Sequence, residues 1–192
     1  MKFDLGPKDN IEAGKGKVLL AEPFLDDPYF KRTVILLCEH NDEGSFGFVL
    51  NNYIDVDLDQ IIEALPEFET KISIGGPVKN SNLYYIHTLG DVIPDSIEII
   101  AGIYMGGDFD KLRDKLAHGL IDKDQIRFFV GYAGWSANQL EEELKLKSWF
   151  VKDVNSGLLM NTGIDDLWKT IMRSMGKSGQ IIANFPDDPT QN

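Results

Sequence analysis

Residues 126–144 read IRFFVGYAGWSANQLEEEL, and they contain the most compact structural signal in the chain. The run Ile126–Tyr132 is apolar and aromatic, which predicts a buried strand. After the segment AGW, Ser136 has the character of a helix N-cap, and Gln139 three residues later is its reciprocal partner. The sequence therefore predicts a strand, a tight corner and a helix with an acidic outer face.

Short apolar runs surround this unit on both sides. Lys17–Glu22 and Thr33–Glu39 are rich in β-branched residues and predict buried strands. The polar segment HNDEGS separates the second of these from Phe46–Asn51, which predicts a β-hairpin. We expect four further strands, at Lys71–Ile74, Asn82–His87, Ser96–Ala101 and Trp149–Val154.

Three more helices are predicted from apolar residues at helical spacing between a capping residue and a stop signal. In the first of them, Gln60 stands at the position that would complete a capping box. The predicted cap and stop residues are Asp57 and Pro66, Asp108 and Gly119, and Asp165 and Gly176.

The resulting order is roughly β-β-β-α-β-β-β-α-β-α-β-α. Hairpins mix with alternating strands and helices, so a mixed sheet covered by about four helices fits better than a regular doubly wound fold. We therefore expect one compact α/β, or mixed α+β, domain over residues 14–183. Residues 1–13 are expected to be a flexible segment, and the polar tail 184–192, with two prolines, is expected to be disordered.

Composition narrows the functional classes. The chain has 192 residues, of which 43% are hydrophobic, and 19 basic against 31 acidic residues give a net charge of −12. A field of that sign repels polyphosphates, which disfavours a nucleic-acid groove. The N-terminus lacks the apolar core of a secretory signal, and no apolar run approaches the roughly 20 residues that span a bilayer. A cytoplasmic protein with no membrane segment is expected, and its lone cysteine should stay reduced.

Cys38 and His40 are two residues apart on a predicted strand, which would place both side chains on one face. One interpretation is a thiol activated by its neighbouring base. The other is a small buried core residue, with His40 beginning the turn. Neither interpretation implies a protease, because no orienting carboxylate is identified.

A metal centre is not predicted. Glu39 and His40 point to opposite faces of a strand, and the chain contains no HxH, HExxH or CxxC motif. His87 is isolated at the end of a predicted strand, where a structural role is expected.

The glycines of GYAGW invite comparison with phosphate-binding loops, since they run from a strand into a helix N-terminus. The lysine of GxxxxGK[ST] is missing, and Glu141 to Glu143 would repel an anion. The alternative is a tight structural corner beside Trp135. The turn at Gly75, Gly76 and Pro77 has the same two interpretations. No cofactor is expected.

Taken together, the motifs resemble the YqgE/AlgH family of bacterial proteins over roughly residues 14–183. They are LLAEPFLDDPYFKRTVILLCEH (19–40), the G-x-V-L-N pattern at 47–51, GGPV (75–78), His87, GYAGWSANQLEEEL (131–144) and DDLW (165–168). The resemblance implies a compact α/β fold with a large mixed sheet in a cytosolic bacterial protein, but no reaction. Most members are uncharacterised, and some carry the label of transcriptional regulator. Members more often have Gly-Pro where this chain has Ser136 and Ala137.

Three functional hypotheses follow. The first is a non-enzymatic regulatory or interaction protein with an unknown protein or small-molecule partner. The second is a thiol-dependent enzyme or redox sensor using Cys38 and His40, and the third is direct nucleic-acid regulation, which the charge disfavours. The candidate reactive or ligand-binding residues are Cys38, His40, Gly75, Gly76, His87, Tyr132, Gly134 and Trp135. The oligomeric state is left open.

Overall fold

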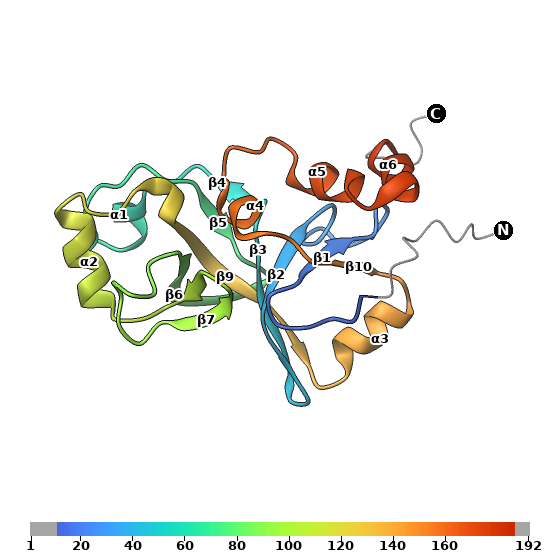
Figure 1. Ribbon diagram of the computed structural model, residues 1–192, viewed down its shortest axis with the longest axis horizontal. Coiled ribbons are helices and arrows are strands. Elements are labelled where there is room, and N and C mark those ends of the chain that lie inside the picture. Colours follow the sequence, from blue (N-terminus) through green and yellow to red (C-terminus); the bar gives the residue numbers. More distant parts are fainter. Residues whose placement is uncertain (1–10, 187–192) are drawn as a thin grey trace.

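The structure, a computed structural model, describes residues 11–186 (Figure 1). Its elements in chain order are β1 Val18–Ala21, β2 Val34–Asn41, β3 Gly44–Val49, β4 Tyr53–Ile54, α1 Leu58–Ile61, β5 Ile72–Ile74, β6 Val78–His87, β7 Ile97–Ile100, β8 Ile103–Met105, α2 Phe109–Ala117, the 3₁₀ turn η1 Lys123–Gln125, β9 Ile126–Ser136, α3 Gln139–Lys145, β10 Trp149–Lys152, α4 Ser156–Met160, α5 Leu167–Arg173 and α6 Gly176–Ala183.

One curled, ten-stranded sheet organises the domain, in the order β10-β1-β2-β3-β9-β6-β8-β7, with β4 and β5 beside it. Neighbouring strands are antiparallel except β5 and β9, which run parallel. Six α-helices lie among the described residues, and four of them have seven or more residues. The predicted single α/β domain with a mixed sheet is therefore confirmed.

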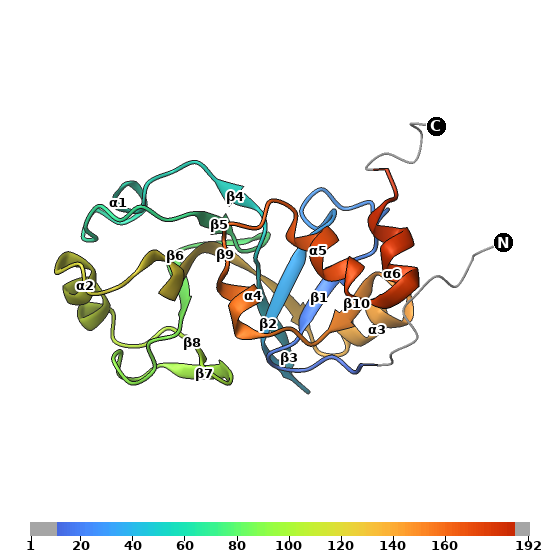
Figure 2. The same ribbon diagram turned by 45° about the horizontal axis from the view of Figure 1, so that its top comes forward.

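Helices cover both faces of the sheet and create three apolar clusters. On one face, α4, α5 and α6 pack over β1, β2 and β3. On the other face, α3 covers β1, β2, β3 and β10, while α1 and α2 cover β5, β6 and the first half of β9. Figures 1 and 2 show this division, with α1 and α2 at one end of the molecule and α3, α5 and α6 at the other.

Curling brings the two ends of the strand order close together. Val18 of β1 and Ile103 of β8 share one apolar cluster, although several strands lie between them in the sheet. Just before β1, a Cβ added to Gly16 would lie 3.1 Å from the Cβ of Ile100 in β7. This close approach requires a residue without a side chain, and the positive φ of 84° at Gly16 also favours glycine.

The strands predicted from apolar runs are present, and the β2–β3 hairpin is confirmed with Asn41 paired to Gly44. Three predictions about helices need correction. The helix after Asp57 has one turn only, because the backbone is already extended at Ile62, and Gln60 bonds the Asp57 side chain instead of its backbone. Helix α5 is capped by Asp166, and Gly176 begins a further helix, α6.

The flanking segments are partly described. In the predicted tail 184–192, the backbone carbonyls of Phe185 and Pro186 accept hydrogen bonds from Arg32, at 2.7 and 2.8 Å. Residues 187–192 lie outside the described residues, as do residues 1–10 of the predicted N-terminal segment. Within residues 11–186, no helix has the length and apolarity needed to cross a bilayer.

Candidate functional site

Cys38 and His40 lie on opposite faces of the sheet, so the prediction that they share a face is wrong. The β2–β3 register shifts between Leu37 and Glu39, which makes Cys38 the extra residue of a β-bulge. A bulge reverses the alternation of side chains beyond it. Cys38 therefore packs into the cluster under α4–α6, while His40 faces Ser45 and α3.

The Cys38 thiol is a core group. It is 3% exposed, its sulfur lies 3.7 Å from the Leu36 carbonyl, and burial raises the pKa of the thiol. Because the thiolate is the reactive form, a buried and protonated Cys38 has the character of a packing residue. The geometry supplies no base for it, since His40 lies across the sheet.

His40 instead joins the β2–β3 hairpin to α3. Its Nδ1 lies 2.8 Å from the Ser45 hydroxyl, and its Nε2 lies 3.7 Å from Glu141 in the first turn of α3. The sequence did not indicate this trio, because only the bulge turns His40 toward the helix. The contacts position α3 against the hairpin.

His87 is fully buried and held in one tautomer. Its Nδ1 accepts a hydrogen bond from the Leu89 amide at 3.1 Å, so the ring proton lies on Nε2, 2.8 Å from the Gly106 carbonyl. Ser96 is 3.2 Å from the same Nε2. A protonated Nε2 is not a base for the Ser96 hydroxyl, and burial lowers the pKa of His87. These contacts fasten the loop after β6 to the end of β8.

The GYAGW segment is not a corner but a continuation of β9 through Ser136. Helix α3 begins after Asn138, which has a left-handed φ of 63°, and Ser136 does not cap it. Instead, the Ser136 amide donates to the Gln139 side chain at 3.1 Å. The phosphate-loop interpretation required a helix that starts directly after the glycines, and that arrangement is absent.

Trp135 belongs to a closed aromatic cluster, which we define as Phe30, Trp135, Trp149 and Glu143. Both indole N–H groups donate to the same Glu143 carboxylate oxygen, at 2.9 and 2.7 Å. The two indole rings meet edge to face, with centroids 6.0 Å apart, and Phe30 packs against both. Trp135 and Trp149 are 6% and 4% exposed, so α3 covers this cluster.

Gly75 and Gly76 mark the point where the chain crosses β9 on its way from β5 to β6. A Cβ at Gly75 would meet the Gly131 carbonyl, and one at Gly76 would meet backbone atoms of Tyr132. The GGPV and GYAGW motifs are therefore in backbone contact, and glycine is needed because no side chain fits between the two segments. The sequence predicted a turn for the first motif and a separate corner for the second.

On the face of β9 opposite Trp135 lies an open aromatic cluster, which we define as Phe46, Tyr84 and Tyr132. These residues come from the adjacent strands β3, β6 and β9, and their centroids lie 5.0 to 6.1 Å apart. All three are partly exposed, and buried Phe48 packs against Phe46 and stacks on buried Phe129. Gly134 lies directly beside the cluster, because a Cβ added to it would lie 3.2 Å from the Tyr132 ring. The sequence indicated Tyr132 and Gly134 but not Phe46 or Tyr84.

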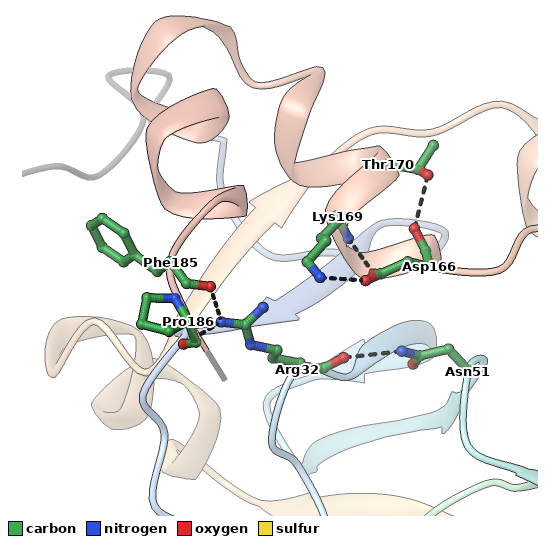
Figure 3. Close-up of polar contacts among 7 residues, drawn as sticks. All are labelled: Arg32, Asn51, Asp166, Lys169, Thr170, Phe185 and Pro186. Carbon is green, nitrogen blue, oxygen red and sulfur yellow. Dashed lines mark hydrogen bonds and ion pairs between the residues drawn. The ribbon is translucent and has the colours of Figure 1, made fainter. Parts of the chain in front are cut away.

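A separate polar cluster fastens the C-terminal helices to the loop before β2 (Figure 3). The Arg32 guanidinium binds the carbonyls of Phe185 and Pro186 and lies 4.8 Å from the Trp168 ring centroid. The Arg32 carbonyl accepts from Asn51, whose own oxygen accepts from the Val34 amide. No sequence motif indicated this cluster, whose contacts are mostly with backbone carbonyls.

Arg127 is a buried cation that also has a structural role. It is 1% exposed, and its guanidinium donates to the carbonyls of Leu50 and Leu159 and to the Tyr53 hydroxyl. Burial lowers its pKa. These contacts join β9 to the end of β3, to β4 and to α4.

Two surface cavities lie away from the predicted residues. One surface cavity of about 420 Å³ lies between the α1–β5 loop and α2, beside Leu65, Pro66 and Arg113. Another, of about 400 Å³, lies at α4 beside Thr88 and Asp124. Among the described residues, no group of three or more His, Cys, Asp or Glu side chains is placed to hold a metal ion. Of the predicted residues, Gly75, Gly76, Tyr132 and Gly134 converge, whereas Cys38, His40, His87 and Trp135 do not.

Comparison with known proteins gives relatives along almost the whole chain. A UPF0301 protein of Cytophaga hutchinsonii is 39% identical over 179 residues, covering 93% of this chain and 98% of the relative. A UPF0301 protein of Chlorobaculum tepidum is 41% identical over 177 residues, covering 92% and 95%.

Solved structures share the fold. The solution structure of the AlgH protein from Pseudomonas aeruginosa matches with a TM-score of 0.71 and 25% identity, over 93% of this chain and 98% of that one. A crystal structure of protein DIP2367 from Corynebacterium diphtheriae gives 0.74 and 23%, over 92% and 95%. The family profile described as AlgH-like matches residues 18–180. The chain therefore belongs to the AlgH-like family, in agreement with the resemblance drawn from its motifs.

Proposed function

We propose that this chain is a non-enzymatic interaction protein of the cytoplasm, with a regulatory role exerted by binding a protein or small-molecule partner. The open aromatic cluster carries the proposal. Three partly exposed rings from three adjacent strands form a rigid apolar surface, and aromatic side chains are enriched where proteins bind partners.

The environments of the titratable candidates support a binding role over catalysis. Cys38 is a buried thiol with a raised pKa, and the Nε2 of His87 is committed to the Gly106 carbonyl. A nucleophile and its base need to lie within hydrogen-bond reach, and Cys38 has no such partner in His40.

Charge supports a partner other than nucleic acid. The net charge of −12 would oppose a duplex over most of the surface, so direct DNA binding is not the proposed regulatory mechanism. The basic residues of the chain are outnumbered 31 to 19 by acidic ones.

Titration with indole, followed by aromatic NMR signals of the full-length chain, tests the proposal. Indole should shift the signals of Phe46, Tyr84 and Tyr132 but leave those of Phe24 and Tyr29, which are exposed elsewhere at 39% and 48%. The Phe46→Ala variant should weaken binding roughly 10-fold, while the matched Phe24→Ala variant should not.

The proposal fails if the ring signals of the open cluster do not respond to indole. It also fails if the chain binds duplex DNA with micromolar affinity at physiological salt and loses that affinity steeply as salt rises.

A further inference from the structure

Beside the open aromatic cluster, one edge of β9 is left without a strand partner. Strands β6 and β9 are antiparallel: His87 pairs with Ile126 at one end, and Val78 pairs with Tyr132 at the other. The chain then crosses β9 at Gly76 instead of continuing along it. The last residues of β9, 133–136, pair with β3 on their other edge. No strand of residues 11–186 lies beside them on the β6 side.

The direction of the backbone groups follows from one hydrogen bond. The Ser136 amide donates to the Gln139 side chain, so it points away from β3. Because successive residues of an antiparallel strand direct their amides to alternate edges, the Gly134 amide and carbonyl point to the same open edge two residues earlier. Gly134 is itself exposed.

Aromatic side chains flank this edge on the face that carries the open cluster. Phe46 is the cross-strand partner of Gly134, and the Tyr132 ring lies over the position that a Gly134 side chain would take. Val78, at the point where β6 diverges, is 39% exposed. An extended segment paired at Gly134 would place alternate side chains against these apolar groups.

The β2–β3 hairpin next to this edge carries three exposed acids. Glu39 is the exposed cross-strand partner of Phe46 on β2, and Asp42 and Glu43 form the exposed hairpin turn beyond it. Lys79 follows Val78 on the β6 side. In a chain of net charge −12, this environment attracts a basic segment.

We propose that the open edge of β9 at Gly134 binds an extended basic segment of a partner protein by strand addition, with an apolar side chain of that segment against Phe46 and Tyr132. This inference rests on the proposed function and names the class of partner for the same surface. Backbone hydrogen bonds supply affinity in such complexes, while alternate side chains supply specificity.

A fluorescein-labelled peptide of alternating arginine and phenylalanine tests the inference on the full-length chain. Binding should be seen by fluorescence anisotropy, and exchange of the Gly134 amide hydrogen, followed by NMR, should slow roughly 10-fold on saturation because the amide gains a partner. A matched peptide with proline at its central positions lacks the backbone donors and should bind at least about 10-fold more weakly.

Protein variants test how much the acidic charge contributes to peptide binding, separately from backbone pairing at the edge. Glu39→Lys should weaken peptide binding about 3-fold or more, whereas Glu142→Lys on exposed α3 should change it less. Both positions are exposed, so neither substitution disturbs the core.

The inference is overturned if the proline peptide binds equally well, if the peptide binds without protecting Gly134, or if it does not bind at millimolar concentration. It is also overturned if Gly134 becomes protected without peptide as protein concentration rises, since the edge would then pair with a second copy. If indole still shifts the open-cluster rings in any of these cases, the proposed function stands and only the partner class is wrong.

Discussion

The closed and open aromatic clusters lie on opposite faces of the same strand, and they are stabilised in different ways. In the closed cluster, Trp135 and Trp149 are buried under α3, and their two N–H groups share the Glu143 carboxylate. In the open cluster, Phe46 and Tyr132 remain partly exposed. A buried indole must have an acceptor, whereas the rings of the open cluster retain contact with solvent.

The difference follows from the way the helices cover the two faces of β9. Side chains alternate along a strand, so Trp135 and Tyr132 point to different faces because they are three residues apart. Helix α3 covers one face at this end of the strand, while on the other face Phe46, Tyr84 and Tyr132 are only partly buried beside the apolar cluster under α4–α6. The exposed rings are therefore a result of helix placement and not of composition.

The largest effect should come from breaking the crossing that positions the open cluster. A Cβ at Gly76 would meet backbone atoms of Tyr132 and Ala133, so the two segments must separate. Gly76→Ala should lower the free energy of unfolding by about 4 kcal/mol, in the range of severe core lesions, as measured by urea denaturation.

Gly134→Ala is the matched control for this substitution. Its Cβ would meet only the edge of the Tyr132 ring, at 3.2 Å, and the ring can move. A cost above about 1 kcal/mol for Gly134→Ala, or equal costs for the two variants, would show that backbone contact at the crossing is not the deciding factor.

Removing the shared acceptor should break the closed cluster with the next largest effect. Glu143→Ala leaves two buried indole donors without their partner, which should cost about 3 kcal/mol. Glu143→Gln keeps one oxygen acceptor and should cost less than half of that. Tryptophan fluorescence during urea denaturation measures both, and Glu142→Ala on exposed α3 should be nearly neutral.

The smallest effect on stability should come from protonation of His87, which lies at the end of β6, the strand that carries Tyr84. Burial lowers the pKa of His87, so the folded protein binds its proton less readily than the unfolded chain, whose histidine titrates near pH 6.5. The stability that neutral His87 contributes is complete above about pH 6.5 and is lost as pH falls below it.

Comparison with His87→Gln isolates this component from other titrating groups. The stability advantage of the natural chain over the variant should shrink by about 1 kcal/mol between about pH 7.5 and pH 5.5. An advantage that stays constant or grows on acidification would show that His87 is not held neutral. In the same titration, tryptophan signals of the closed cluster should change only with global unfolding.

Sequence patterns predicted elements well wherever local residues decide the outcome. Apolar runs located β1, β2 and β9, and the cap at Asp108 and the glycine at Gly119 bounded α2. Patterns failed for β4, β8 and α4, which have at most five residues, and for α6, which is separated from α5 by only two residues. They also failed at Ser136, because pairing with Gly44 continues β9 through it.

The candidate site was predicted only in part, for the same reason. Tyr132 and Gly134 could be selected from one motif, but Phe46 and Tyr84 join them only because β3 and β6 pair with β9. The thiol hypothesis depended on alternation along β2, and the bulge at Cys38 interrupts that alternation.

The sequence by itself determined the mixed α/β class and most strands, because hydrophobic period, capping and glycine preferences act over a few residues. The acidic charge follows from residue counts, and the family was indicated by the resemblance of the motifs. Tertiary structure alone decided that GGPV crosses GYAGW, that a bulge separates Cys38 from His40, and that β9 keeps an open edge beside exposed rings. These features depend on which strands pair and which face a helix covers. Such long-range contacts are fixed by packing of the whole chain, and no local pattern encodes them.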